Sequence, residues 1–145
     1  MKTIHLIVAT RPNFMKLAPL AKALDNEKWC KYKIIHTGQH YDHNMSEVFF
    51  EDLNIPHPDI NLGIGSGTHA EQTGKTMIEY EKLLFQETPD ITIVFGDVNA
   101  TLACALTARK LHIFVGHVEA GLRSGDMEMP EEINRILTDH ISDIL

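Results

Sequence analysis

The chain is short and acidic, and these two properties already narrow its functions. Its 145 residues include 13 lysines and arginines against 20 aspartates and glutamates, for a net charge of −7. A chain of this length buries a real hydrophobic core, and we expect one domain spanning residues 1–145. Nucleic acid is an unexpected partner for such a chain, because the longest basic run is the pair Arg109 and Lys110.

Cysteine usage and hydropathy indicate the compartment. Cys30 and Cys104 lack the spacing of metal ligands, and we predict that they bind no metal and that the chain is reduced. The apolar run from Ile4 to Ala9 is too short for a signal peptide, and no stretch reaches membrane-spanning length. We therefore expect a cytoplasmic protein without a membrane partner.

Apolar segments alternate with helical patterns along the chain. The expected strands cover residues 4–9, 32–36, 91–95 and 111–115. The expected helices follow Pro12, lie near 45–50, start at the Thr68 capping box, cover about 100–111, and follow Pro130. The segment 56–67 is predicted to be an irregular loop. This alternation predicts a Rossmann-like α/β fold, a doubly wound parallel sheet in three layers.

One helix carries a prediction of its buried face. In the helix that starts after Thr68, the apolar spacing predicts that the following residues face the core: Met77, Ile78, Leu84 and Phe85.

Two cations stand at the start of the first expected helix. Arg11 follows the first strand and Lys16 comes about one turn later. Positive charge is unfavourable at a helix N-terminus unless an anion binds there, and this position suits a phosphate group. The alternative is that both side chains point into solvent, where charges cost little.

Several carboxylates follow strands or begin helices. Asp97 comes after the 91–95 strand, where it or Asn99 can simply cap the next helix. Glu119 has no helix of its own to cap, and a salt bridge to Arg123 is the alternative to a chemical role. Glu131 follows Pro130 at a helix start, where the helix dipole favours acids.

These residues are expected to converge. The carboxyl ends of parallel strands lie at one edge of a sheet, where ligands bind in open α/β folds. We expect Arg11, Gln39, Asp97, Glu119 and Glu131 at that edge. Carboxylates crowded in one cleft cannot all ionise cheaply, so one becomes a general acid. A paired acid and base beside an anion site indicates chemistry on a phosphorylated or nucleotide-linked substrate.

Four sequence blocks stand out: TRP at 10–12 with KLAPL at 16–20, TGQH at 37–40, GD at 96–97 with TLA at 101–103, and HVEAGLR at 117–123 with PEEINR at 130–135. With these blocks the chain resembles the non-hydrolysing UDP-N-acetylglucosamine 2-epimerases, and the resemblance covers essentially its whole length. The family's fold pairs two Rossmann-like domains of the glycosyltransferase-B type, and this chain resembles the first. The C-terminal nucleotide-binding domain is absent from these 145 residues.

The resemblance implies an isomerase without a cofactor. The family interconverts UDP-N-acetylglucosamine and UDP-N-acetylmannosamine by eliminating UDP and adding it back. The positions that match the family's catalytic carboxylates are Asp97, Glu119 and Glu131. The residues expected to bind substrate are Arg11, Lys16, Gln39, His117 and Arg123.

The chain departs from the family at several positions. Ala9 and Asn13 replace residues beside Arg11, and Asp42 and Lys75 replace two residues that hold an activating substrate molecule in many bacterial members. We expect a homodimer, a UDP-sugar substrate and no activity for the chain alone. Three alternatives stay open: a 2-epimerase of another UDP-acetamido sugar, a stand-alone sugar-nucleotide-binding module without catalysis, and a structural unit that only dimerises.

Overall fold

A five-stranded parallel sheet with the order β3-β2-β1-β4-β5 runs through the centre of the molecule. The computed structural model describes residues 1–38, 47–52 and 54–145. Its elements are β1 (Lys2–Val8), α1 (Arg11–Asp25), β2 (Cys30–His36), α2 (Glu47–Asp52), β3 (Ile60–Asn61), α3 (His69–Gln86), β4 (Ile91–Phe95), α4 (Asn99–Lys110), β5 (Phe114–Val118) and α5 (Pro130–Ile141).

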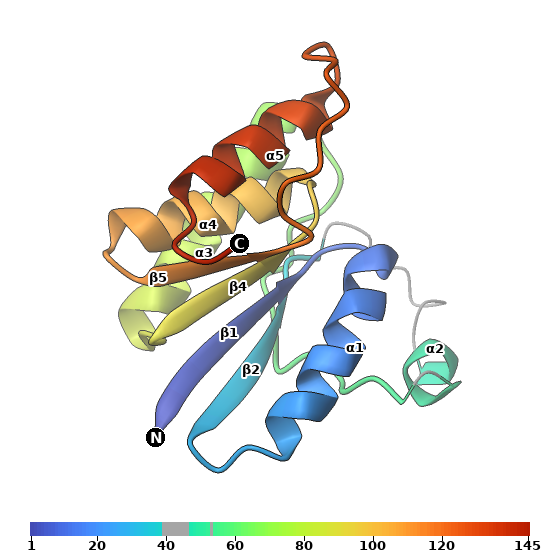
Figure 1. The fold of residues 1–145 in the computed structure, drawn as a ribbon, viewed down its shortest axis with the longest axis vertical. Helices are drawn as coiled ribbons and strands as arrows, with labels where there is room; N and C mark the ends of the chain where they lie inside the picture. Colours follow the sequence, from blue (N-terminus) through green and yellow to red (C-terminus); the bar gives the residue numbers. More distant parts are fainter. Residues whose placement is uncertain (39–46, 53) are drawn as a thin grey trace.

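The helices form a layer on each face of the sheet. Helices α1 and α2 lie on one side, and α3, α4 and α5 lie on the other (Figure 1). The predicted three-layer, doubly wound α/β fold is therefore confirmed. Each face has its own core: Phe14 and Leu17 pack on the α1 side, whereas Tyr80 and Cys104 pack on the α3–α4 side.

The strand order determines where the candidate functional residues lie. β1 and β4 are neighbours although the chain crosses the sheet between them, and β5 lies beside β4. All strands run in parallel, so the segments after β1, β4 and β5 lie at one edge. Helix α1 begins there because Asn13 accepts hydrogen bonds from the amides of Ala9 and Thr10, at 3.1 and 3.2 Å, and closes the turn.

Three sequence predictions need correction. The last strand is Phe114–Val118 and not 111–115, because Leu111 and His112 close helix α4. A short strand, β3, lies inside the segment predicted to be irregular, where it pairs with the end of β2. The buried face of α3 also differs from the prediction, since Ile78 is 55% and Phe85 71% exposed. That face comprises Thr76, Tyr80, Leu83 and Leu84.

The chain ends in a strand-like segment beside β5. Ile144 forms a parallel bridge with Gly116, and the amide of His117 donates to the Ile144 carbonyl at 2.9 Å. Asp143 fixes this segment by accepting from the Val115 amide at 2.9 Å and from Arg109 at 3.2 Å. In the part of the chain that the structure describes, no helix is long and apolar enough to cross a membrane.

A buried histidine gives the fold a pH-dependent stability. His5 is 3% exposed, with Nδ1 3.2 Å from the Tyr80 hydroxyl, which in turn lies 2.8 Å from Thr92 Oγ1. Burial lowers the pKa of His5 from 6.5 to about 4, although the nearby Glu87 opposes the shift and Lys33 adds to it.

We therefore expect acid to destabilise the chain through His5. Between pH 6.5 and about 4, His5 is protonated in the unfolded chain but neutral in the native state. The free energy of unfolding therefore falls as pH falls. The full loss is on the order of 3 kcal/mol. Urea unfolding of wild type and His5→Gln from pH 8 to 4 measures it. Parallel pH profiles of the two proteins would contradict the assignment.

Candidate functional site

The ends of β4 and β5 are joined where the candidate carboxylates begin. The Gly96 amide donates to the Val118 carbonyl at 3.1 Å. Asp97 and Glu119, which follow the neighbouring strands β4 and β5, therefore lie side by side. Gly96 has φ +72°, a left-handed conformation that favours glycine, and a β-carbon there would lie 3.3 Å from Asn13 Nδ2. The turn before Asp97 is therefore packed against the start of α1.

Glu119 is held in an unusual conformation. Its φ of +70° lies in the left-handed region, which costs a non-glycine residue about 1 kcal/mol. Its carboxylate forms an ion pair with Lys16 of α1, and both side chains are about one third exposed. The predicted alternative partner, Arg123, pairs with Asp139 instead. A strained acidic residue at the edge of a sheet is a candidate for chemistry.

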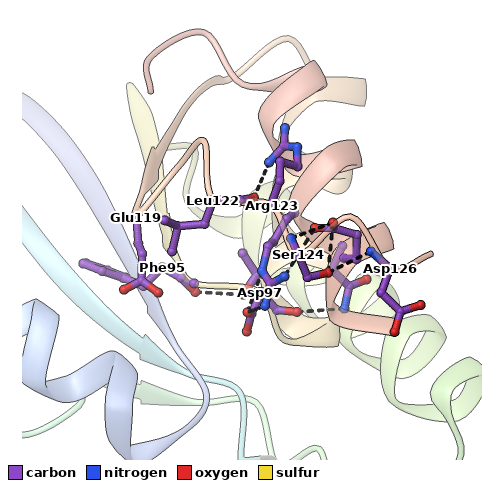
Figure 2. A network of polar contacts seen from close by, with 12 residues as sticks. Phe95, Asp97, Glu119, Leu122, Arg123, Ser124 and Asp126 are labelled. Carbon is purple, nitrogen blue, oxygen red and sulfur yellow. Dashed lines mark hydrogen bonds and ion pairs between the residues drawn. The ribbon is translucent and has the colours of Figure 1, made fainter. Parts of the chain in front are cut away.

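Asp97 does not cap the helix that follows it. Helix α4 begins at Asn99 with Val98 as its N-cap, and no side chain caps it. The Asp97 carboxylate instead accepts from Arg135 of α5, whose Nε and second terminal nitrogen lie 3.0 and 2.9 Å from Oδ2. Asn134 also donates to the Asp97 carbonyl at 2.9 Å. In the view of Figure 2, Asp97 lies between Glu119 and Ser124.

Glu132 holds the loop between β5 and α5. It is 1% exposed, and Oε2 accepts from the Ser124 amide at 2.8 Å, the Ser124 hydroxyl at 3.0 Å and the Gly125 amide at 2.6 Å. Arg135 donates to its other oxygen at 3.3 Å. Burial alone raises a carboxyl pKa, but these donors together outweigh it and lower the pKa of Glu132. The loop is thus built around an ionised carboxylate.

His117 lies beneath the site and not on its surface. Its side chain is fully buried, with Nδ1 2.6 Å from Asp139 Oδ1 and Nε2 2.6 Å from the Gly96 carbonyl. Because both ring nitrogens are occupied, neither can contact a ligand in this arrangement. Asp139 also accepts from the Gly121 amide at 2.9 Å and from Arg123 at 2.8 Å.

The remaining candidates lie around this network. Arg11 is exposed at the N-terminus of α1. Glu131 is exposed in the first turn of α5, one turn before Arg135, and no hydrogen bond or ion pair joins its side chain to another described residue. Gln39 lies outside the described residues. The structure thus brings Lys16 to Glu119 and places Glu131 on the helix that contacts Asp97.

Three supporting residues were not singled out from the sequence. Glu132, Arg135 and Asp139 project from α5 toward Ser124, Asp97 and His117. Their spacing of three and then four positions places charged side chains on one helix face, on the side opposite to solvent. That spacing is the sequence signal that could have identified these three residues, because charges on a buried helix face need partners.

An open groove of about 620 Å³ lies next to Glu119. Its lining is largely apolar and comes from α1, β4, β5, the loop after β5 and the C-terminal segment: Leu20, Ile91, Ile93, Gly116, His117, Val118, Glu119, Ala120, Gly121, Ile144 and Leu145. Among the described residues, no group of three or more histidine, cysteine, aspartate or glutamate side chains is arranged to hold a metal ion.

The fold and the position of the site define a Rossmann-like domain of the glycosyltransferase-B type. MurG of Acinetobacter baumannii shares this fold at 18% identity, with a TM-score of 0.65 over 99% of the chain. The family model for UDP-N-acetylglucosamine 2-epimerase matches residues 22–145. The chain belongs to that family, which confirms the resemblance seen in the sequence.

The similar proteins include enzymes for more than one sugar. The UDP-N-acetylglucosamine 2-epimerase of Methanocaldococcus jannaschii is 58% identical over 98% of this chain. The UDP-2,3-diacetamido-2,3-dideoxy-D-glucuronate 2-epimerase of Pseudomonas aeruginosa is 52% identical over 98%. The M. jannaschii structure in complex with UDP-GlcNAc and UDP matches 99% of the chain with a TM-score of 0.94 and 57% identity.

This chain corresponds to a part of those relatives. It spans 38% of the M. jannaschii sequence and 40% of the P. aeruginosa sequence. It likewise covers 39% of the M. jannaschii chain in the solved complex.

We expect Glu132→Gln to loosen the loop after β5. The amide side chain keeps the shape but replaces an ionised acceptor of three loop hydrogen bonds. Amide hydrogen exchange at Ser124 and Gly125 should accelerate roughly tenfold or more. Glu131→Gln, on the exposed side of the same turn, is the control. Unchanged protection in Glu132→Gln would show that the carboxylate does not hold the loop.

Proposed function

We propose that this chain supplies the sugar-facing catalytic half of a UDP-N-acetylglucosamine 2-epimerase. The observation that supports it most is the pairing of Glu119 with Lys16 and of Asp97 with Arg135 at one sheet edge, with Glu131 on the same helix as Arg135. Family membership supplies the reaction class. The chain spans 38% of its M. jannaschii relative, and we propose that a C-terminal domain supplies the remaining nucleotide contacts.

The reaction requires a base and an acid around one sugar carbon. A carboxylate removes the proton from C2, the C–H electron pair forms the double bond between C1 and C2, and UDP leaves with the C1–O pair. Addition in reverse delivers a proton to the opposite face of C2. Asp97, Glu119 and Glu131 are the proposed proton carriers, and two faces of the sugar require more than one of them.

The cations serve the departing diphosphate. Arg11 stands at the N-terminus of α1, where helix amides and a guanidinium favour phosphate. Lys16 lies one turn further and is paired with Glu119. We propose that the diphosphate competes for the Lys16 ammonium and releases the Glu119 carboxylate for proton transfer. Arg123, paired with Asp139, is a further proposed substrate contact.

A closely related substrate is the second candidate. The P. aeruginosa relative acts on a diacetamido glucuronate sugar nucleotide at 52% identity, close to the 58% of the M. jannaschii enzyme. Both substrates offer the same C2 chemistry beside a UDP leaving group. Turnover of each sugar nucleotide by one preparation separates the two candidates.

The proposed setting is the cytoplasm, as a homodimer. Both cysteines are free and buried, which fits a reducing compartment. Ile133 and Leu137, four residues apart on α5, are 40% and 44% exposed, and we propose that a second copy covers them. Sedimentation should give a dimer for wild type and a monomer for Leu137→Glu. A monomeric wild type would contradict this proposal.

Turnover of a chimera tests the catalytic assignment. We would fuse residues 1–145 to the C-terminal part of the M. jannaschii relative and follow epimerisation by proton NMR. Asp97→Asn, Glu119→Gln and Glu131→Gln should each reduce kcat about 10²- to 10⁴-fold, because each removes a proton carrier. Glu128→Gln, exposed in the same loop, is the matched control. A fully active Glu119→Gln chimera would overturn the proposal.

A further inference from the structure

The contacts of His117 define its protonation. Nε2 lies 2.6 Å from the Gly96 carbonyl oxygen, and Nδ1 lies 2.6 Å from Asp139 Oδ1. A carbonyl oxygen only accepts hydrogen bonds, so Nε2 carries a proton. An ionised carboxylate also only accepts, so Nδ1 carries one as well. A ring with both nitrogens protonated is an imidazolium.

Asp139 is surrounded by donors that favour its ionised form. Its Oδ2 accepts from the Gly121 amide at 2.9 Å and from Arg123 at 2.8 Å, and its side chain is 8% exposed. Burial by itself opposes ionisation, but the donors from Gly121, Arg123 and His117 outweigh it and lower the pKa of Asp139. The negative charge next to His117 is therefore built into the fold.

The groups that Asp139 and His117 hold are neighbours of the candidate catalytic residues. The His117 Nε2–H fixes the carbonyl of Gly96, directly before Asp97. The Asp139 carboxylate fixes Gly121, two residues after Glu119. The pair thus joins the turn after β4, the loop after β5 and helix α5 at a single buried point.

We propose that Asp139 and His117 are a positioning pair: a buried imidazolium–carboxylate unit that fixes the turn carrying Asp97 and the loop carrying Glu119. Neither residue contacts the sugar. The consequence for rate rests on the proposed function, whereas the charge state of His117 does not. A displacement of either carboxylate by about 1 Å would slow proton transfer severely.

The charges around His117 are compatible with a buried cation. Asp139 faces it from α5, and Arg123 faces the same carboxylate from the loop. Lys16 approaches Gly96 from α1, and its ammonium lies 3.8 Å from the position that a β-carbon on residue 96 would occupy. The Glu119 carboxylate neutralises this ammonium. His117 and Arg123 share the Asp139 carboxylate, but the Arg123 side chain is 40% exposed and stays solvated, whereas Lys16 has Glu119 beside it. The buried imidazolium therefore has a carboxylate in direct contact, which is the condition for keeping a buried charge.

Nitrogen NMR of the histidine rings tests the charge state directly. The 145-residue chain is labelled with ¹⁵N-histidine, and His117→Gln identifies the signal among its nine histidines. We expect both His117 nitrogens to remain protonated at pH 8, where an ordinary imidazole has one bare nitrogen. A single bare nitrogen on His117 in wild type at this pH would overturn the proposal.

Two variants separate positioning from general stability. In Asp139→Asn we expect His117 to lose a proton at pH 8 and the Gly121 amide to exchange faster with solvent. Asp90→Asn removes a carboxylate that pairs with Lys2 at the opposite edge of the sheet, and it should leave His117 unchanged. If Asp139→Asn keeps a doubly protonated His117 and an unchanged Gly121, the carboxylate does not position this unit.

Activity measurements on the chimera distinguish the positioning pair from the proposed function. In the chimera, Asp139→Asn should lower kcat about 10- to 100-fold with little change in KM, and Asp139→Glu should recover part of it. An inactive wild type with a doubly protonated His117 would refute the proposed function alone. An active wild type whose His117 has one bare nitrogen would refute the positioning pair alone.

Discussion

Charge pairing between α5 and the ends of β4 and β5 is the interaction on which the site depends. Arg135 holds Asp97, Glu132 holds the Ser124–Gly125 turn, and Asp139 holds His117 and Gly121. One helix face therefore orients segments that belong to separate strands. Loss of this face would leave the strands intact and the carboxylates without fixed positions.

Stability alone does not require charged residues on the buried face of α5. Apolar side chains could fill the same space, and they are often as stabilising as buried ion pairs. Glu132 instead has a carboxylate on this face and is 1% exposed, and Glu119 adopts a φ of +70°. Strain and buried charge concentrated at one sheet edge are typical of functional sites.

The sequence predicts the fold well because local signals agree with the tertiary structure. The Thr68–Glu71 capping box starts α3 as expected, with the Glu71 amide donating to the Thr68 hydroxyl at 3.2 Å. The positions of Asp97 and Glu119 after expected strands also predict that both lie at one sheet edge, where the structure places them. The strand before Glu119 was misplaced by three residues because Leu111 begins an apolar run that only His112 interrupts, although both residues close helix α4.

The ion pairs could not be read from the sequence, because they depend on three-dimensional spacing. Arg123 is the nearest cation to Glu119 in the loop, yet Lys16, about a hundred residues earlier, is its partner. His117 appears in the sequence as a surface ligand candidate, and only the β5 register places it inside. Asp139 carries no motif, so its role emerges from its contacts alone.

The most direct test of the central claim is chemical-shift mapping of a sugar nucleotide on the ¹⁵N-labelled chain. Titrations with UDP and with UDP-N-acetylglucosamine would be compared residue by residue. The account predicts that shifts specific to the sugar cluster at the amides of Gly96, Asp97, Glu119 and Gly121. Sugar-specific shifts confined to the opposite edge of the sheet, around His5 and Glu87, would contradict it.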